Sequence, residues 1–241
     1  MTSETLKVGP LTKTFGRTVA LDEVSFEIRP DEVLGVIGPN GAGKTTLFEC
    51  LAGILPLDSG GIAEGARPLT RREQSNRLFY VPDQIAPWPT ESVQWALDFT
   101  VGFFNGVKAR RNAVVESLRL QPLLKTRLGA LSKGQRKRVL LAVGLLTPQP
   151  ILLIDEPFEG LDLRQRREVA DALASTLTDG RTLVLSIHQI SEAARVCDRF
   201  VLLSGGRVGG EGTVEELARL VASKGTGTGR ADLEDLFLAL T

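Results

Sequence analysis

The sequence contains few of the residues that cross-link small proteins or build transition-metal sites. Its 241 residues include two cysteines and one histidine. Cys50 and Cys197 lie far apart and form no CxxC pair, so neither a disulfide framework nor a zinc site is expected. Both stand in apolar surroundings, and we expect two buried thiols in a reducing compartment.

Long hydrophobic runs and an excess of one charge are also missing. The longest apolar stretch covers residues 139–146, far short of the roughly 20 residues that span a bilayer. The first residues lack the apolar segment of a secretory signal. The 29 basic and 29 acidic residues cancel, which leaves no global field for nucleic acid or an anionic membrane. We therefore expect a soluble, cytoplasmic protein without a nucleic-acid partner.

Strand and helix patterns alternate along most of the chain. Residues 23–28 alternate apolar and polar side chains, as in a strand with one wet face. The stretches 33–38, 151–155 and 182–187 are apolar throughout, which is typical of strands covered on both faces. Helical patterns follow at 135–147, 164–177 and 190–196. This order predicts an open α/β fold.

Two segments depart from that alternation. Residues 91–104, 109–120 and 123–132 show three helical patterns with no strand between them, which predicts an inserted helical subdomain. At the other end, residues 222–230 have the composition of a flexible linker, and residues 231–240 form a short amphipathic pattern.

The helical insertion carries five aromatic residues. They are Trp88, Trp95, Phe99, Phe103 and Phe104. We expect most of them in the core of the subdomain, with one or two exposed if a partner docks there.

The stretch GPNGAGKT at 38–45 matches the pattern G-x-x-x-x-G-K-[ST] and lies between a buried strand and a helix. Its glycines allow the backbone N–H groups to curl around a phosphate, and the following helix N-terminus adds attraction. Lys44 would reach the β- and γ-phosphates, and the Thr45 hydroxyl would hold Mg²⁺. The residues expected to bind the nucleotide here are Gly38, Pro39, Asn40, Gly41, Ala42, Gly43, Lys44, Thr45 and Thr46.

An acidic pair ends the strand at 151–155. A Mg²⁺ ion beside a phosphate loop needs a second protein oxygen from a neighbouring strand, and Asp155 meets that need. The carboxylate of Glu156 can orient and polarise a water that attacks the γ-phosphate. Such a pair could also be a solvated turn, but the phosphate loop favours a P-loop NTPase that uses ATP and Mg²⁺.

The stretch LSKGQ at 131–135 places a serine hydroxyl and a glycine N–H at a helix start, which suits an anion. Ser132 could also be an ordinary helix cap. With the phosphate loop, residues 151–156 and Gly160-Leu161-Asp162, nearly the whole chain resembles the nucleotide-binding domain of ABC transporters.

The resemblance implies an α/β fold with a P-loop NTPase (RecA-like) core. This core has a mostly parallel sheet, an N-terminal antiparallel β subdomain and an inserted α-helical subdomain. Residues 1–241 would form one nucleotide-binding domain. Its helical signature subdomain would span about 88–135, and a C-terminal extension about 205–241.

The resemblance also implies roles for single residues. In that family two domains face each other head to tail, and the signature of one, here Ser132, Gly134 and Gln135, closes over the ATP held by the other. Asp162 would belong to the D-loop at the nucleotide. His188 would be the switch histidine, which contacts the γ-phosphate and holds Glu156, although a lone histidine is more often a core or surface residue. One phosphate loop and one signature imply a dimer, either with itself or with a related ATPase subunit.

Three positions depart from the family pattern. Lys133 replaces the first of two signature glycines, and Phe15 stands where a tyrosine often stacks on adenine. The slot of the Q-loop glutamine, which joins Mg²⁺ to the partner's docking site, holds Asp83, with Gln84 one place later. Either Gln84 reaches the metal through a one-residue shift, or Asp83 coordinates it, and we favour Asp83.

We therefore expect an ATPase subunit, peripheral on the inner face of the cell membrane, that powers a separate integral membrane permease. The C-terminal sequence is similar to that of export-type subunits, which favours export only weakly. The resemblance also implies that the transported substrate is recognised by the membrane subunit. The alternative is a soluble ABC-type ATPase acting on a nucleic-acid or protein complex, although the usual second cassette, long coiled coil or zinc module is not seen. A kinase is opposed by the signature and His188.

Overall fold

A six-stranded sheet runs through the middle of the computed structural model, which describes residues 4–83, 85–106, 108–177, 180–223 and 233–241. Its strand order is β10-β9-β3-β8-β7-β6, in which β9, β3, β8, β7 and β6 are parallel and β10 pairs antiparallel with β9. The strands are β3 (Val33–Ile37), β6 (Leu78–Val81), β7 (Ile151–Asp155), β8 (Thr182–Ile187), β9 (Arg199–Ser204) and β10 (Arg207–Gly212). The predicted α/β fold with a mostly parallel sheet is confirmed.

Both faces of this sheet are covered, which explains the apolar runs without alternation. Leu34 and Val36 of β3 face one buried cluster, together with helix α1 (Lys44–Leu51). Val33 and Ile37 face a second cluster. The second cluster also receives side chains from α6 (Leu163–Leu177), α7 (Ile190–Val196), α8 (Val214–Ser223) and α9 (Leu233–Leu240).

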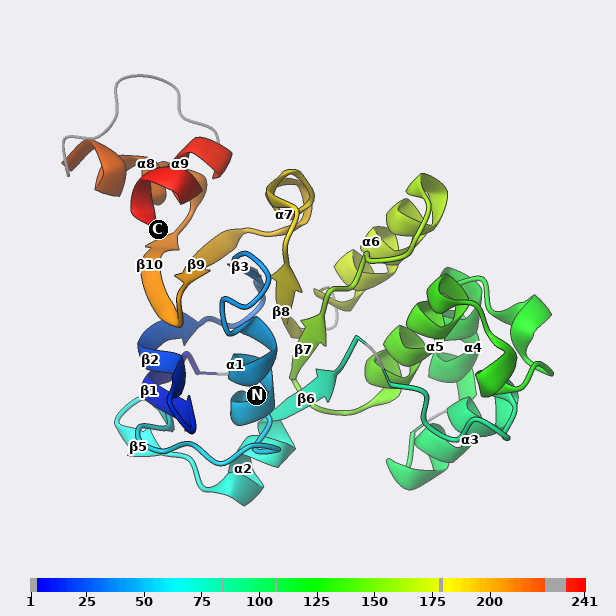
Figure 1. Cartoon of the computed structure of the whole chain (residues 1–241). Coiled ribbons are helices and arrows are strands. Elements are labelled where there is room, and N and C mark those ends of the chain that lie inside the picture. The colour runs from blue at the N-terminus through cyan, green and yellow to red at the C-terminus, as the bar shows by residue number, and fades with distance from the viewer. Residues whose placement is uncertain (1–3, 84, 107, 178–179, 224–232) are drawn as a thin grey trace.

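A second sheet, antiparallel, packs against the other side of α1 (Figure 1). Its order is β2-β1-β4-β5, with β1 (Leu6–Phe15), β2 (Thr18–Ile28), β4 (Ile62–Glu64) and β5 (Arg67–Pro68), and helix α2 (Arg71–Arg77) follows. Leu11, Leu21 and Phe26 of this sheet share one buried cluster with Phe48 of α1. Helix α1 is therefore clamped between two sheets, and the loop that leads into it is held in place.

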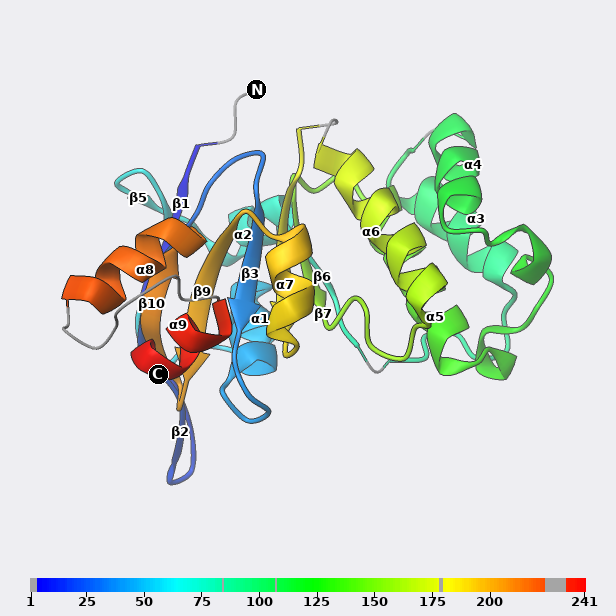
Figure 2. The same ribbon diagram turned by 90° about the horizontal axis from the view of Figure 1, so that it is seen from above.

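Three helices gather at one end of the molecule, beside α6 (Figures 1 and 2). They are α3 (Val93–Phe103), α4 (Lys108–Ser117) and α5 (Lys133–Leu146), and we call residues 93–146 the helical region. The third helix predicted here, at 123–132, is wrong: the chain forms two short 3₁₀ turns, Gln121–Leu123 and Leu128–Ala130. The N–H of Leu128 donates to the Glu91 carbonyl, and the Thr126 carbonyl accepts from Val93. These bonds use backbone groups that an α-helix would need.

The expected burial of the aromatic residues is also wrong for four of the five. Trp88 and Trp95 are each 38% exposed, Phe99 44% and Phe103 69%. Helix α3 turns Val93, Ala96, Leu97 and Thr100 toward the core, and these positions form one face of a 3.6-residue helix. Trp95, Phe99 and Phe103 repeat every four residues on another face, and Trp88 packs edge-on against Trp95. We call these four residues the aromatic row.

The C-terminal part of the chain contains helices α8 and α9, which lie at the opposite end of the molecule from the helical region (Figure 2). The predicted helix at 231–240 is observed as α9, whereas most of the predicted linker lies outside the described residues. Cys50 is buried and Cys197 partly buried, and both are free thiols. Burial raises the pKa of Cys50 to about 11 and also raises the pKa of Cys197. Within the described ranges, no helix combines the length and apolar character needed to cross a membrane.

Candidate active site

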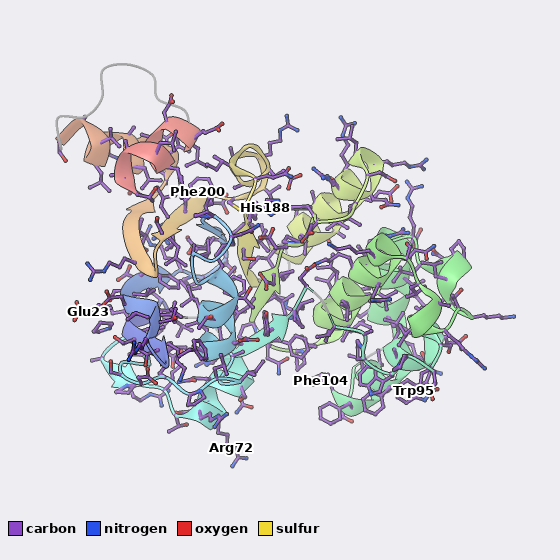
Figure 3. All side chains as sticks on the ribbon, in the orientation of Figure 1. Glu23, Arg72, Trp95, Phe104, His188 and Phe200 are labelled. Atoms are coloured by element: carbon purple, nitrogen blue, oxygen red, sulfur yellow. The ribbon has the colours of Figure 1, made fainter. Side chains whose placement is uncertain are left out.

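The carboxyl ends of β3, β7 and β8 meet at one edge of the parallel sheet. In the pairing register Ile37 lies beside Ile187, and Asp155 beside Ser186. The loop after β3, the residue after β7 and the residue after β8 therefore arrive at the same edge. Figure 3 shows His188 in the middle of the molecule, between the helical region and the C-terminal helices. Open α/β sheets bind ligands at such an edge.

A groove of about 780 Å³ opens at this edge, within the usual size of a small-molecule site. We call it the central groove. It is lined by Thr18, Val19, Ala20, Asn40, Gly41, Ala42, Gly43, Lys44, Thr45, Thr46, Glu49, Tyr80, Pro82, Asp83, Ile85, Asp155, Glu156, Glu159 and His188.

The backbone of the loop after β3 fits a phosphate. Gly41 and Gly43 have φ values of 82° and 104°, in the left-handed region that favours glycine. A Cβ added to Gly43 would lie 2.5 Å from the carbonyl oxygen of Ala20 on β2. Helix α1 starts directly after Gly43, so its free N–H groups and positive end face the loop. The residues present therefore match the cradle that a nucleotide phosphate requires.

Lys44 is held inside this loop. Its ammonium group donates to the carbonyl oxygens of Gly38 at 2.7 Å and Pro39 at 3.2 Å. The same nitrogen lies 3.7 Å from the Glu156 carboxylate. Burial lowers the pKa of Lys44, and the nearby charges of Glu156 and Asp155 oppose that shift. A cation is thus positioned at the end of the groove that the loop 38–45 lines.

Asp155 and Thr45 supply the oxygen donors that Mg²⁺ prefers. The Thr45 hydroxyl donates to Asp155 Oδ2 at 2.9 Å. The Tyr80 hydroxyl donates to the same oxygen at 3.2 Å, and the Ser186 hydroxyl donates to Oδ1. Among the described residues no three His, Cys, Asp or Glu side chains cluster as a metal site. The donor set therefore fits Mg²⁺, which usually completes its coordination with water and substrate phosphate.

Tyr80 and Ser186 were not identified from the sequence. Ser186 is fully buried and interrupts an apolar strand, so a polar residue in that position was the signal that could have revealed it. Tyr80 stands on β6 in the stretch that precedes Asp83. Burial raises the pKa of Tyr80, and the negative charge of Asp155 adds to that shift. Its hydroxyl therefore stays a hydrogen-bond donor to Asp155.

His188 and Glu156 form a direct contact at the mouth of the groove. His188 Nδ1 lies 2.6 Å from Glu156 Oε2. The backbone N–H of Glu156 donates to the carbonyl and the hydroxyl of Ser186, at 3.2 and 3.1 Å. Burial raises the pKa of Glu156, whereas the hydrogen bond with His188 lowers it. The single histidine thus lines the central groove instead of packing in the core.

The signature residues lie elsewhere. The described residues that line the central groove do not include Ser132, Gly134, Gln135 or Asp162. Ser132 is exposed and caps α5: its hydroxyl accepts from the Gln135 N–H at 3.3 Å, and Gln135 Oε1 accepts from the Ser132 N–H at 3.0 Å. Asp162 is exposed and caps the start of α6 by accepting from the Gln165 N–H at 2.9 Å.

Phe15 and the Q-loop position have partners of their own. Phe15 is 48% exposed, pairs with Thr18 across the β1–β2 hairpin, and lies 5.4 Å from the Lys13 ammonium group, measured to the ring centre. Asp83 lines the groove, and Lys137 Nζ donates to its Oδ1. Gln84 lies outside the described residues, so the alternative between Asp83 and Gln84 stays a prediction. Lys133 Nζ lies 2.6 Å from Glu159 Oε1.

Comparison with known proteins identifies the family of this chain. Residues 21–159 match the family model described as ABC transporter. An uncharacterised ABC transporter ATP-binding protein of Methanocaldococcus jannaschii is 32% identical over 90% of this chain and 80% of its own length. The Nod factor export ATP-binding protein I of Rhizobium etli is 33% identical over 86% of this chain and 67% of its own length.

A solved structure shows the same fold over nearly the whole length. The ATP-binding subunit of an ABC transporter superposes with a TM-score of 0.85 at 26% identity, covering 98% of both chains. The family match covers more than half of the 241 residues, and the relatives cover most of the remainder. The chain therefore belongs to the ABC transporter family, as an ATP-binding subunit that hydrolyses ATP.

Proposed function

We propose that this subunit hydrolyses ATP as a head-to-tail dimer in which each central groove is completed by the signature of the other chain. The observation that carries this proposal is that the signature residues lie apart from the groove lined by the phosphate loop. The phosphate loop, Asp155, Glu156 and His188 share one groove. Ser132 is exposed at the N-terminus of α5 and is absent from the described lining of that groove. A helix N-terminus left open at the surface can bind the phosphates of a second molecule.

Within one half-site the residues have separate tasks. The loop 38–46 and Lys44 hold the β- and γ-phosphates, and Phe15 at the β1–β2 hairpin stacks on the adenine. Thr45 and Asp155 would hold Mg²⁺, which neutralises phosphate charge when bound. The Glu156 carboxylate orients and polarises the attacking water, and His188 keeps that carboxylate in place through the 2.6 Å contact.

The partner of the dimer is proposed to be a separate integral membrane permease at the inner face of the cell membrane. The aromatic row supports this, because four large apolar side chains on one side of the helical region are rarely left exposed without a partner. The relative from Rhizobium etli is named for Nod factor export, which favours export as the direction of transport. The whole chain 1–241 would act as one nucleotide-binding domain, with a helical signature subdomain at about 88–135 and a C-terminal extension at about 205–241.

Mixed dimers test the head-to-tail arrangement. Lys44→Ala removes the phosphate contact of its own groove, and Ser132→Arg blocks the signature that its chain offers to the other groove. Each variant alone should be inactive, whereas a mixture should recover about a quarter of the parent activity, because half of the dimers contain one intact site. Specific activity of the parent should also rise with protein concentration. A mixture as inactive as its components, or turnover strictly linear in a demonstrated monomer, would contradict the proposal.

A further inference from the structure

Arg166 of α6 bridges the two segments that follow Glu156 and His188. Its Nε donates to the backbone carbonyl oxygen of Leu161 at 3.0 Å, and its Nη1 donates to the Glu192 carboxylate. Leu161 belongs to the loop that follows Glu156. Glu192 lies in the first turn of α7, the helix that follows His188. One guanidinium group thus holds the loop and the helix together.

The loop between Glu156 and Leu161 is fixed by two overlapping turns. The Glu159 N–H donates to the Glu156 carbonyl at 3.2 Å, and the Leu161 N–H donates to the Phe158 carbonyl at 3.3 Å. Phe158 and Leu161 are buried in the second cluster. Because each turn shares residues with the next, a displacement of the Leu161 carbonyl would be passed back to Glu156.

The chain after His188 is also held by backbone hydrogen bonds. The N–H groups of Glu192 and Ala193 donate to the Gln189 carbonyl, at 3.0 and 3.2 Å. Helix α7 is therefore hydrogen-bonded from the residue next to His188, and Ala193 anchors its first turn in the core. Fixing the Glu192 carboxylate thus fixes the start of α7 and the backbone that carries the imidazole.

These bonds form a closed ring of contacts. The 2.6 Å contact between His188 Nδ1 and Glu156 Oε2 lies at one side of the ring, and Arg166 closes the other side. The His188 side chain is 35% exposed, so packing holds its imidazole less firmly than it would hold a buried ring. Productive geometry at such a position requires support from surrounding hydrogen bonds.

We propose that the Arg166–Glu192 ion pair is a positioning device for hydrolysis, which holds α7 against the loop that leads into α6 so that His188 keeps its contact with the catalytic carboxylate. The inference rests on the proposed function, in which Glu156 activates water and His188 keeps it in place. The described lining of the central groove includes neither Arg166 nor Glu192. The pair therefore acts through the catalytic residues and not on ATP.

Four variants separate this role from a general loss of stability. Arg166→Met removes both bonds of the guanidinium group. Glu192→Ala removes only the link to α7 and keeps the bond to Leu161, so it tests the proposal even if Arg166→Met folds poorly. Glu192→Gln is the conservative replacement, because its amide oxygen can still accept from Arg166. Arg164→Met is the matched control, because it breaks an exposed ion pair with Glu168, at 3.0 Å, within α6.

The first readout is the ring-nitrogen NMR signal of His188, the single histidine of the chain, in full-length protein without nucleotide or a histidine tag. Glu156→Ala marks the signal expected when the contact is absent. Arg166→Met and Glu192→Ala should move the signal at least about half of the way to that position, because the hydrogen bond of one ring nitrogen sets the state of both. Arg164→Met and Glu192→Gln should keep the parent signal.

The second readout is turnover, measured together with ATP affinity. Arg166→Met and Glu192→Ala should lower turnover by about five- to twentyfold while ATP affinity stays within about threefold of the parent. In a His188→Ala background the same substitutions should cost less than about twofold, since the group that they position is gone. Glu192→Gln should recover most of the turnover that Glu192→Ala loses.

A parent-like His188 signal in both Arg166→Met and Glu192→Ala would overturn the inference alone, because the proposed function needs the contact but not this ion pair. Losses that multiply fully with that of His188→Ala, or equal losses in Arg164→Met, would also overturn it. Unchanged turnover in both Glu156→Gln and His188→Ala would overturn the proposed roles of those two residues and the inference with them.

Discussion

At the scale of single residues, the backbone of Glu156 has an uncommon conformation that its neighbours hold in place. Its φ of 47° lies in the left-handed region, which costs a non-glycine residue on the order of 1–3 kcal/mol. Both hydrogen bonds from its N–H go to Ser186, and its carboxylate lies between His188 and Lys44. Strained backbone that is fixed by surrounding contacts is frequent at catalytic positions.

This geometry predicts that Glu156 and His188 act as one unit. Glu156→Gln keeps the shape but removes the charge, so turnover should fall by roughly 10²–10⁴ while ATP still binds. His188→Ala should also slow hydrolysis. Added to Glu156→Gln, it should cost much less than the product of the single effects. Steady-state rates of the four proteins measure this, and losses that multiply fully would contradict the pairing.

Two further measurements test the roles of Glu156 and His188. His188→Ala removes a hydrogen bond that lowers the pKa of Glu156. The carboxyl group must be ionised to polarise water, so the acid side of the rate profile should move to higher pH in that variant. Glu156→Gln should bind ATP but hydrolyse it very slowly, so it should accumulate as a dimer on size exclusion with ATP and return to monomer with ADP. An unchanged acid side or a persistent monomer would count against the assignment.

At the scale of elements, the phosphate loop owes its conformation to the packing of α1 between two sheets. The antiparallel sheet brings the Ala20 carbonyl so close to Gly43 that a Cβ would lie 2.5 Å away. At Gly41, by contrast, an added Cβ meets no atom within 4 Å. The two glycines share a left-handed backbone but differ in their surroundings. Substitutions at the two positions therefore separate the effect of backbone strain from that of the contact with β2.

Alanine substitutions at these two positions should therefore differ. Gly41→Ala should lower the free energy of unfolding by about 1–2 kcal/mol, the cost of a left-handed alanine. Gly43→Ala adds a collision with β2, so its loss should exceed that of Gly41→Ala by about 1–3 kcal/mol, and nucleotide affinity should fall further. Urea unfolding and calorimetric titration give both quantities. Equal losses at the two positions would show that β2 does not constrain the loop.

At the scale of the whole molecule, the central groove and the aromatic row are separate surfaces. The aromatic row lies on the helical region. Figure 3 shows Trp95 on the rim of that region, away from His188. Trp95 and Phe99 stack with ring centres 5.1 Å apart, and Phe99 and Phe103 are 6.1 Å apart. A continuous apolar strip of this kind suits an apolar segment of a partner protein.

The aromatic row predicts which substitutions would release the proposed membrane subunit. A tagged parent chain should copurify from a detergent extract with a hydrophobic protein of several membrane spans. Phe99→Ser/Phe103→Ser should reduce the recovered partner at least about tenfold while ATP affinity is kept. Leu238→Ser on α9 is the control, because Leu238 is 74% exposed outside the row. Equal recovery with both variants would remove the row from the interface, and copurification with nucleic acid or ribosomes would favour a soluble ABC-type ATPase.

Much of the candidate nucleotide site could be predicted from the sequence because its parts are local. Residues 38–45 are consecutive, and their turn between a strand and a helix follows from glycine, lysine and threonine at fixed spacing. The apolar runs of β3, β7 and β8 indicated strands buried on both faces. Parallel strands place their carboxyl ends at one edge, so Asp155, Glu156 and His188 could be expected together.

The tertiary structure decided the features that depend on which distant segments pack together. Lys137 meets Asp83 across 54 residues, and Ser186 meets Asp155 across 31 residues. No periodicity along the chain carries such pairs, since each forms only when a helix or strand is docked on its neighbour. The exposure of the aromatic row follows from which face of α3 meets the core. The segment 121–130 forms turns because two of its backbone groups bond outside it. The Leu128 N–H donates to the Glu91 carbonyl, and the Thr126 carbonyl accepts from the Val93 N–H.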